Sequence, residues 1–190
     1  MYDEATHIFP HQLETERLIL RPPRPGDGRL INDAIHESFS ELHRWMPWAR
    51  AMPSIEESES FARDAWARYR ARDDYPIILI DRKSGALIGA SGLHPRDWSV
   101  PKFEIGYWAR TSWAGRGYIT EAVHALVDFA FEGLHAQRLI IRCDAENRRS
   151  AAVAERAGFH LEARLHHDAR DNQGDLCDML LYARLPSSGS

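Results

Sequence analysis

The chain has 190 residues, of which 44% are hydrophobic and 27% charged, a balance that predicts one folded domain over residues 1–190 and argues against disorder. Its formal net charge of −4 gives no overall positive field to gather nucleic acid or to bind an anionic membrane. Two cysteines cannot build a disulfide framework or a metal knuckle, and no segment approaches the roughly 20 apolar residues that span a bilayer. We therefore expect a cytoplasmic protein without a metal site, ending in a loose tail at 186–190.

The first third of the chain predicts one strand and two helices. Arg17–Arg21 is a short β-like run that two prolines stop. Apolar residues then recur at helical spacing over Gly26–Ser40, and a second helix is expected over Ser54–Arg72, with Ser54 as its cap and Glu57 three residues later. Between these helices, Leu42–Trp48 is a connection unusually rich in aromatic residues.

The remaining chain predicts a hairpin, a strand–helix–strand unit and a second hairpin. The expected strands cover 77–81, 87–93, 103–108, 139–143, 159–165 and 176–182, and the expected helices cover 119–131 and 150–156. The strand–helix–strand unit requires a right-handed crossover between two parallel strands. With the first strand and the first two helices, this order predicts a mixed α/β fold of seven strands and about four helices.

The segment Gly115–Ala122 follows the expected strand 103–108 and opens the helix after it. Two glycines, Gly115 and Gly117, allow a tight turn, and the start of a helix presents unpaired N–H groups and a positive dipole end. Such a loop can hold a phosphate group, although it can also be a simple strand-to-helix connection. No Lys-Ser or Lys-Thr pair follows and no third glycine completes a dinucleotide fingerprint, so the pattern indicates a pyrophosphate ligand other than ATP or NAD.

From about Leu13 to Leu185 the chain resembles the GNAT superfamily of acyl-CoA-dependent N-acetyltransferases. The resemblance rests on separate segments: Leu13–Arg21, Ile105–Trp108 with Gly115–Ala122, and Asn147-x-x-Ser150 followed by Ala157–Glu162. Trp45–Trp48 and the ending Asp178–Arg184 are most similar to the ribosomal-protein-serine and -alanine N-terminal acetyltransferases. The resemblance implies a mostly antiparallel sheet with two splayed strands, and a possible homodimer.

The same resemblance implies acetyl-CoA as the cofactor. Amides from Arg116 to Thr120 would hold its pyrophosphate, and the main chain of Trp108–Arg110 would pair with its pantetheine arm. The expected cofactor-binding residues are Trp108, Ala109, Arg110, Gly115, Arg116, Gly117, Tyr118, Ile119, Thr120 and Asn147. The loop departs from the family pattern at Ala114, where Gln or Arg is usual, and at Ile119, where Gly or Ala is usual.

Transfer of an acetyl group to an amine requires a base, and Glu104 is the first candidate. A carboxylate partly withdrawn from water on the strand beside the cofactor slot could take the proton. Strand alternation could instead turn Glu104 away from the substrate, or an arginine could pair with it. His94, His166, His167 and Asp168 are the alternatives. The glutamate proposed as base in the most similar branch has no counterpart in 165–171.

The leaving thiolate and the acceptor amine give two further predictions. Many members of the superfamily protonate the thiolate with a tyrosine that 147–158 lacks, so Ser150 takes that role by position, or else caps a helix. Trp45 and Trp48 are candidates for the acceptor-binding wall, with core packing as the alternative.

The acceptor is expected to be a protein N-terminal amine. A small amine such as a polyamine is the alternative, which an acidic mouth built from Glu37, Glu41 and Glu56 would suit. A third possibility is a non-catalytic acyl-CoA-binding module.

Overall fold

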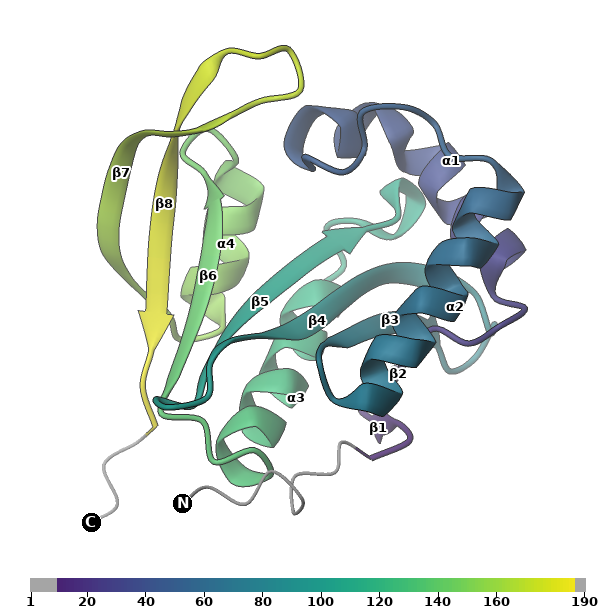
Figure 1. Ribbon diagram of the computed structural model, residues 1–190, viewed down its shortest axis with the longest axis horizontal. Coiled ribbons are helices and arrows are strands. Elements are labelled where there is room, and N and C mark those ends of the chain that lie inside the picture. The colour runs from purple at the N-terminus through teal and green to yellow at the C-terminus, as the bar shows by residue number, and fades with distance from the viewer. Residues whose placement is uncertain (1–9, 187–190) are drawn as a thin grey trace.

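One open sheet of eight strands forms the centre of the molecule (Figure 1). The computed structural model describes residues 10–186. The strands are β1 (Leu13–Glu14), β2 (Leu18–Arg21), β3 (Tyr75–Asp81), β4 (Leu87–Asp97), β5 (Lys102–Ala109), β6 (Arg138–Asp144), β7 (His160–Arg170) and β8 (Leu176–Arg184). Their order in the sheet is β1-β2-β3-β4-β5-β6-β8-β7, and β5 with β6 is the parallel pair in an otherwise antiparallel sheet.

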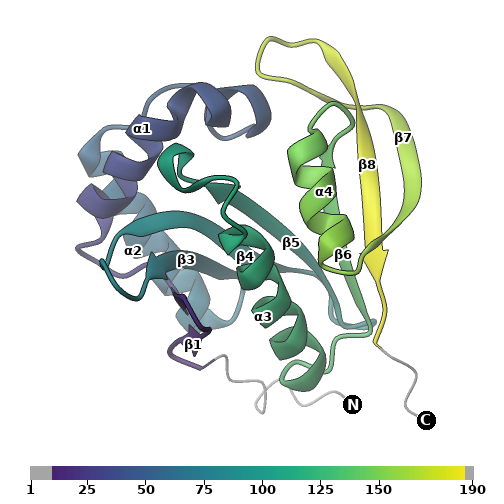
Figure 2. The ribbon, with the colours of Figure 1, turned by 180° about the vertical axis from the view of Figure 1, so that it is seen from behind.

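Helices cover both faces of the sheet. They are α1 (Gly28–Trp45), α2 (Ile55–Ala71), α3 (Tyr118–Glu132) and α4 (Arg148–Arg156), with a short 3₁₀ helix η2 (Thr111–Trp113) before α3. Helices α1 and α2 lie on one face, and α3 and α4 lie on the other, toward the viewer in Figure 2. The predicted mixed α/β architecture and its strand–helix–strand unit are therefore confirmed.

Three details differ from the sequence prediction. The sheet has eight strands, because Leu13–Glu14 adds a strand too short to show a periodic pattern. Helix α1 continues to Trp45, so the expected aromatic connection is mostly the last turn of a helix. Helix α4 begins at Arg148, with Asn147 rather than Ser150 as its cap. Of the predicted tail, 187–190 lie outside the described residues.

Alternation along the central strands divides the core between the two faces. In β3, Ile77 and Leu79 belong to the larger cluster, which includes Val123 and Leu126 of α3. Their neighbours Ile78 and Ile80 pack with residues of α1 and α2 in a second cluster. Both sets are almost fully buried, so β3 is apolar from Tyr75 to Ile80 rather than alternating.

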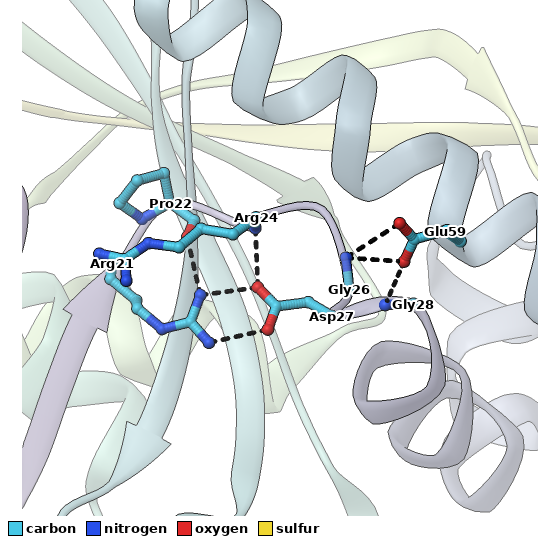
Figure 3. A network of polar contacts seen from close by, with 7 residues as sticks. All are labelled: Arg21, Pro22, Arg24, Gly26, Asp27, Gly28 and Glu59. Atoms are coloured by element: carbon cyan, nitrogen blue, oxygen red, sulfur yellow. Dashed lines mark hydrogen bonds and ion pairs between the residues drawn. The ribbon is translucent and has the colours of Figure 1, made fainter.

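Helix α1 begins in a network of ionic and backbone contacts (Figure 3). The Asp27 carboxylate accepts two hydrogen bonds from the Arg21 guanidinium, at 2.6 and 2.9 Å, and one from the Arg24 backbone N–H. Glu59 of α2 accepts from the N–H groups of Gly26 and Gly28, at distances of 2.9 to 3.1 Å. A neighbouring helix thus satisfies the N–H groups that open α1, which fixes α1 against α2.

Strands β5 and β6 pair for a short distance and then separate. Their register joins Lys102 with Arg138, Phe103 with Leu139, and Glu104 with Ile140. Continued in phase, the register would bring Tyr107 opposite Cys143, but the ladder ends at Glu104. The expected splaying of the two parallel strands is confirmed, and it leaves the edge of β5 beyond Glu104 facing a gap in the sheet ladder (Figure 1).

Within residues 10–186, no helix is both long and apolar enough to cross a bilayer. Over the same residues, no group of three or more His, Cys, Asp or Glu side chains gathers where it could hold a metal ion. Both cysteines are free thiols, with Cys143 buried and Cys177 partly exposed.

Candidate active site

The loop before α3 has the geometry of an anion site. Gly115 and Gly117 adopt φ angles of 76° and 81°, in the left-handed region that favours glycine, and Gly117 is the N-cap of α3. The first intrahelical bond runs from Glu121 N–H to Gly117 O, at 3.0 Å. The N–H groups of Tyr118, Ile119 and Thr120 come before that bond, so helix geometry leaves them for a ligand.

The segment between β1 and β2 holds this loop through one ion pair. The Arg17 guanidinium binds the Glu121 carboxylate at 2.6 Å and donates to the Arg116 backbone oxygen at 3.0 Å. Thr15 Oγ1 also donates to Glu121, at 2.5 Å. Burial pushes the Glu121 pKa upward, but the hydrogen bonds from Thr15 and Arg17 prevail and lower it. Glu121 therefore stays ionised and keeps the turn in place.

Next to this loop the surface is hollowed. The hollow has a volume of about 640 Å³, borders Gly117 and Thr120, and extends to Arg156 of α4. The Arg156 Nε donates to Thr120 Oγ1 at 3.4 Å, so a guanidinium lies close to the start of α3. The Arg156 guanidinium and free N–H groups thus lie at the start of α3, where the sequence predicted the phosphates to bind, while the carboxylates of Glu14, Glu16, Glu121 and Asp128 also line the hollow.

Trp108–Arg110, the residues expected to pair with a pantetheine arm, are the open end of β5 and the residue that follows it. Trp108 pairs with Ala90 and Ala109 with Gly89, while the Arg110 N–H donates to Ile88 O at 2.9 Å. All three contacts lie on the β4 side. The opposite edge of the strand faces the gap toward β6 and could accept an extended ligand as a further strand.

Tyr107 and Ser150 meet between β5 and α4. Ser150 Oγ donates to Tyr107 Oη at 3.2 Å, and Tyr107 Oη donates to the Ser150 backbone oxygen at 2.8 Å. Burial raises the Tyr107 pKa, so the phenol remains protonated at neutral pH. Asn147 accepts the Ser150 N–H at 3.1 Å through Oδ1, so it orders the turn that carries the serine.

Glu104, Gly106 and Trp108 share the face of β5 opposite Tyr107, as the alternation of a strand requires. The Trp108 ring lies 6.4 Å from that of Trp48, which is 51% exposed, and together the two rings form an aromatic wall. The Glu104 carboxylate accepts a hydrogen bond from Arg96 Nε at 3.0 Å. Glu104 therefore shares a face with Trp108, and it has the arginine partner that the alternative interpretation anticipated.

The two tryptophans expected at the acceptor site are placed differently. Trp45 ends α1 with the Arg44 guanidinium 4.4 Å from its ring centroid, whereas Trp48 lies beside Trp108. Glu37, suggested for an acidic mouth, binds Arg110 Nε at 2.6 Å and Ser112 N–H at 2.9 Å. Its charge is thus used within the fold. The hydrogen bonds from Ser112 and Arg110 lower the Glu37 pKa.

The β7–β8 hairpin reaches across to the end of α1. Asn172, at its tip, donates through Nδ2 to the backbone oxygens of His43 and Met46, at 2.7 and 2.9 Å. These carbonyls lie at the C-terminus of a helix and lack intrahelical partners. The hairpin therefore joins the two sides of the splayed sheet (Figure 1).

Sequence reasoning missed two features of the site. It sought a tyrosine in α4, but the hydroxyl beside Ser150 comes from Tyr107 of β5. It also missed the contact between His94 and Asp74, whose Nδ1 and Oδ1 atoms lie 2.6 Å apart. Residues distant in the sequence meet in both cases, so local spacing gave no signal; only the alternation along 103–108 could have placed Tyr107 on the face opposite Glu104.

Comparison with known families agrees with this geometry. Residues 17–160 match the acetyltransferase (GNAT) domain family, so the chain belongs to that family and the resemblance seen in the sequence is confirmed. YdaF of Bacillus subtilis, provisionally named a ribosomal N-acetyltransferase, is 31% identical over 162 residues, which cover 80% of this chain and 88% of YdaF. The ribosomal-protein-serine acetyltransferase of Escherichia coli is 38% identical over 119 residues, covering 60% and 63%.

Solved structures with the same fold include complexes with the cofactor. The ribosomal alpha-N-protein acetyltransferase RimL with coenzyme A has a TM-score of 0.81 and 22% identity, covering 90% of this chain and 95% of that chain. The microcin C7 self-immunity acetyltransferase MccE with acetyl-CoA and AMP has a TM-score of 0.85 and 22% identity, covering 94% and 98%.

Proposed function

We propose that this protein is an acetyl-CoA-dependent N-acetyltransferase whose acceptor is a protein N-terminal amine. One observation carries the proposal: β5 leaves its ladder with β6 after Glu104 and then leads, through η2, into the glycine-capped start of α3. An extended thioester cofactor needs both features, because one end carries phosphates and the other must lie along free backbone. Family membership and the cofactor complexes of RimL and MccE support the same assignment.

The residues present fit that cofactor. The N–H groups from Arg116 to Thr120 and the guanidinium of Arg156 would hold the phosphates, and the free edge of Trp108–Arg110 would bind the pantetheine. When bound, acetyl-CoA supplies an activated acetyl group as a thioester. The aromatic wall of Trp48 and Trp108 would shield the reacting amine from water, and Ser150, coupled to Tyr107, would provide a proton for the departing thiolate.

Two observations favour a protein N-terminus over a polyamine. One of the relatives that the sequence matches is a ribosomal-protein-serine acetyltransferase. In addition, Glu37 is bound to Arg110 and Ser112, which removes one carboxylate from the acidic mouth that a polyamine would require. Trp48, half exposed on the surface of this wall, could contact the first side chain of a peptide.

The test is incubation with acetyl-CoA and a mixed panel of peptides that begin with Ser or Ala, polyamines and aminoglycosides. Mass spectrometry would identify any product that is 42 Da heavier, the mass an acetyl group adds on replacing a hydrogen. Acetylated peptides are the expected result. Acetylation of a small amine alone would replace the acceptor part of the proposal, and tight coenzyme A binding without any product would favour a binding module.

A further inference from the structure

We infer that His94, oriented by Asp74, is the general base that deprotonates the acceptor amine; this inference rests on the proposed function. His94 is on β4, directly opposite Glu104 of β5 in the antiparallel register. Cross-strand partners point to the same face of a sheet, so the imidazole shares the face of Glu104 and Trp108. The side chain is 32% exposed, so a ligand on this face can reach it.

Contacts with Asp74 determine which ring nitrogen carries the proton. Asp74 Oδ1 lies 2.6 Å from His94 Nδ1 and also accepts the Tyr75 backbone N–H at 3.0 Å, while Oδ2 lies 3.6 Å from Arg68 Nη1. An ionised carboxylate can only accept hydrogen bonds, so Nδ1 must be the donor. The lone pair is then on Nε2, as a base requires.

Two strand glycines make room for this ring. A Cβ on Gly92 would lie 2.8 Å from both Nε2 and Cε1 of His94, a distance at which the ring would have to move. A Cβ on Gly106 of β5 would lie 3.7 Å from Nε2. Nε2 therefore lies over the cross-strand pair of Gly92 and Gly106, closer to Gly92, and Gly106 is on the strand that borders the gap. Glycine weakens a strand interior, and its presence at both positions indicates that the space is used.

The charged groups around His94 give His94 and Glu104 different roles on this face. Asp74 lies behind the ring with Arg68 of α2 on its far side, while Glu104 lies across from it and is bound to Arg96 of β4. Glu104, with its arginine partner, is placed to attract an incoming ammonium group. His94 has a free lone pair and a carboxylate behind it, so it is the better placed of the two to remove the proton.

The acceptor arrives as R–NH₃⁺, and His94 Nε2 takes one proton, which it later releases to water. The amine nitrogen then forms a bond to the thioester carbon, the carbon–sulfur bond breaks, and sulfur leaves with the electron pair. The second amine proton passes to the thiolate through the Ser150 hydroxyl, giving R–NH–acetyl and coenzyme A.

The test compares His94→Gln with His160→Gln, a control on the exposed start of β7. With whichever acceptor the panel identifies, His94→Gln should lower kcat by about 10²–10³-fold and leave coenzyme A affinity unchanged. It should also abolish the fall in kcat/KM on the acid side of the pH profile, which Glu104→Gln should retain. In His94→Ala, added imidazole should restore part of the rate, and His160→Gln should behave as wild type.

A His94→Gln rate within twofold of wild type with an unchanged pH profile would overturn the inference. If only Glu104→Gln lost the fall in kcat/KM on the acid side of the pH profile, Glu104 and not His94 would be the base. A separate readout needs no acceptor: the ¹⁵N shifts of the His94 ring in wild-type protein should place the neutral-state proton on Nδ1, and a proton on Nε2 would contradict the assignment. A wild-type protein that acetylates nothing, but has the Nδ1–H tautomer, would instead count against the proposed function.

Discussion

Gly117 is the single residue on which the phosphate site depends most. It has a left-handed φ of 81°, and a Cβ there would lie 3.6 Å from Arg17 Nη2. We expect Gly117→Ala to weaken coenzyme A binding by about tenfold, because the methyl group would enter the cradle and the turn would resist the left-handed conformation, at about 1–2 kcal/mol. Isothermal titration calorimetry would measure the affinity.

The matched control is Gly26→Ala. Gly26 also has a positive φ, 99°, with open space around its Cβ position, but it precedes α1 on the other face of the sheet. Both variants should lose similar stability in urea unfolding. If both variants bound coenzyme A equally weakly, backbone strain alone would explain the loss of affinity, and the phosphate cradle at Gly117 would be refuted.

Trp48 should affect the acceptor and not the cofactor. Because about half of Trp48 is buried, Trp48→Ala should lower the free energy of unfolding by about 1–2 kcal/mol. Loss of the wall beside Trp108 should raise KM for the acceptor about tenfold, equivalent to about 1.4 kcal/mol. Steady-state kinetics with varied acceptor would measure this change, with Trp45→Ala as the comparison. A larger effect at Trp45 would reverse the assignment.

At the residue scale, the sequence predicted features that depend on local spacing. The glycines of 115–117 and the capping box of Ser54 with Glu57 are confirmed, because both are made within a few residues. The sequence could not predict the partners of Glu104 and Ser150. Arg96 and Tyr107 come from positions that only the pairing of strands brings close, so the chemistry of each side chain depended on the register.

At the scale of elements, one carboxylate stabilises the β7–β8 hairpin. Asp178 accepts hydrogen bonds from the His167 N–H, from Arg164 Nε and from His166 Nδ1, at 2.8 to 3.0 Å. The backbone bond from His167 is the largest influence, and together they lower the Asp178 pKa to about 2. An aspartate in the unfolded chain titrates near about 3.9.

The sign of the resulting pH dependence follows from this depression. The unfolded state binds the proton first, so the stabilisation from Asp178 is complete above about pH 5, declines below about pH 4, and is lost as pH falls through about 2. The stability difference between wild type and Asp178→Asn should therefore shrink over that window. Urea unfolding at several pH values would measure it, and a difference that stays constant down to pH 2 would contradict the assignment.

The crossing of α1 and α2 depends on Gly28. A Cβ at this position would lie 2.6 Å from the Glu59 Cα and 2.7 Å from its backbone N. Since backbone atoms cannot move aside as a flexible side chain can, Gly28→Ala should lower the free energy of unfolding by about 1–3 kcal/mol. The exposed Ser60→Ala, on the same helix as Glu59, should stay within about 0.5 kcal/mol of wild type. Equal stability of both variants would show that the helices can separate.

Element boundaries show where sequence patterns reach their limit. The apolar periodicity located all four helices and seven of the eight strands, because burial imposes periods of 3.6 and 2. It missed β1, whose two residues carry no period, and the last turn of α1. The end of α1 is fixed by tertiary contacts, since Asn172 of the β7–β8 hairpin satisfies its carbonyls from 126 and 129 residues away.

For the molecule as a whole, the sheet is held together at both ends of the gap between β5 and β6. At one end three residue pairs join the strands, and at the other Asn172 connects the hairpin to α1. The phosphate loop opens on the side of α3, whereas the aromatic wall and His94 lie on the opposite face. This arrangement would let the cofactor and the acceptor enter from different sides and meet in the gap.

The central claim is that the gap between β5 and β6 receives the pantetheine of acetyl-CoA. A crystal structure with bound coenzyme A tests it most directly. We predict phosphates on the N–H groups at 116–120, the pantetheine along Trp108–Arg110, and the thiol between Ser150 and the face that carries His94. Coenzyme A bound elsewhere on the surface, with the gap closed by side chains, would contradict the account.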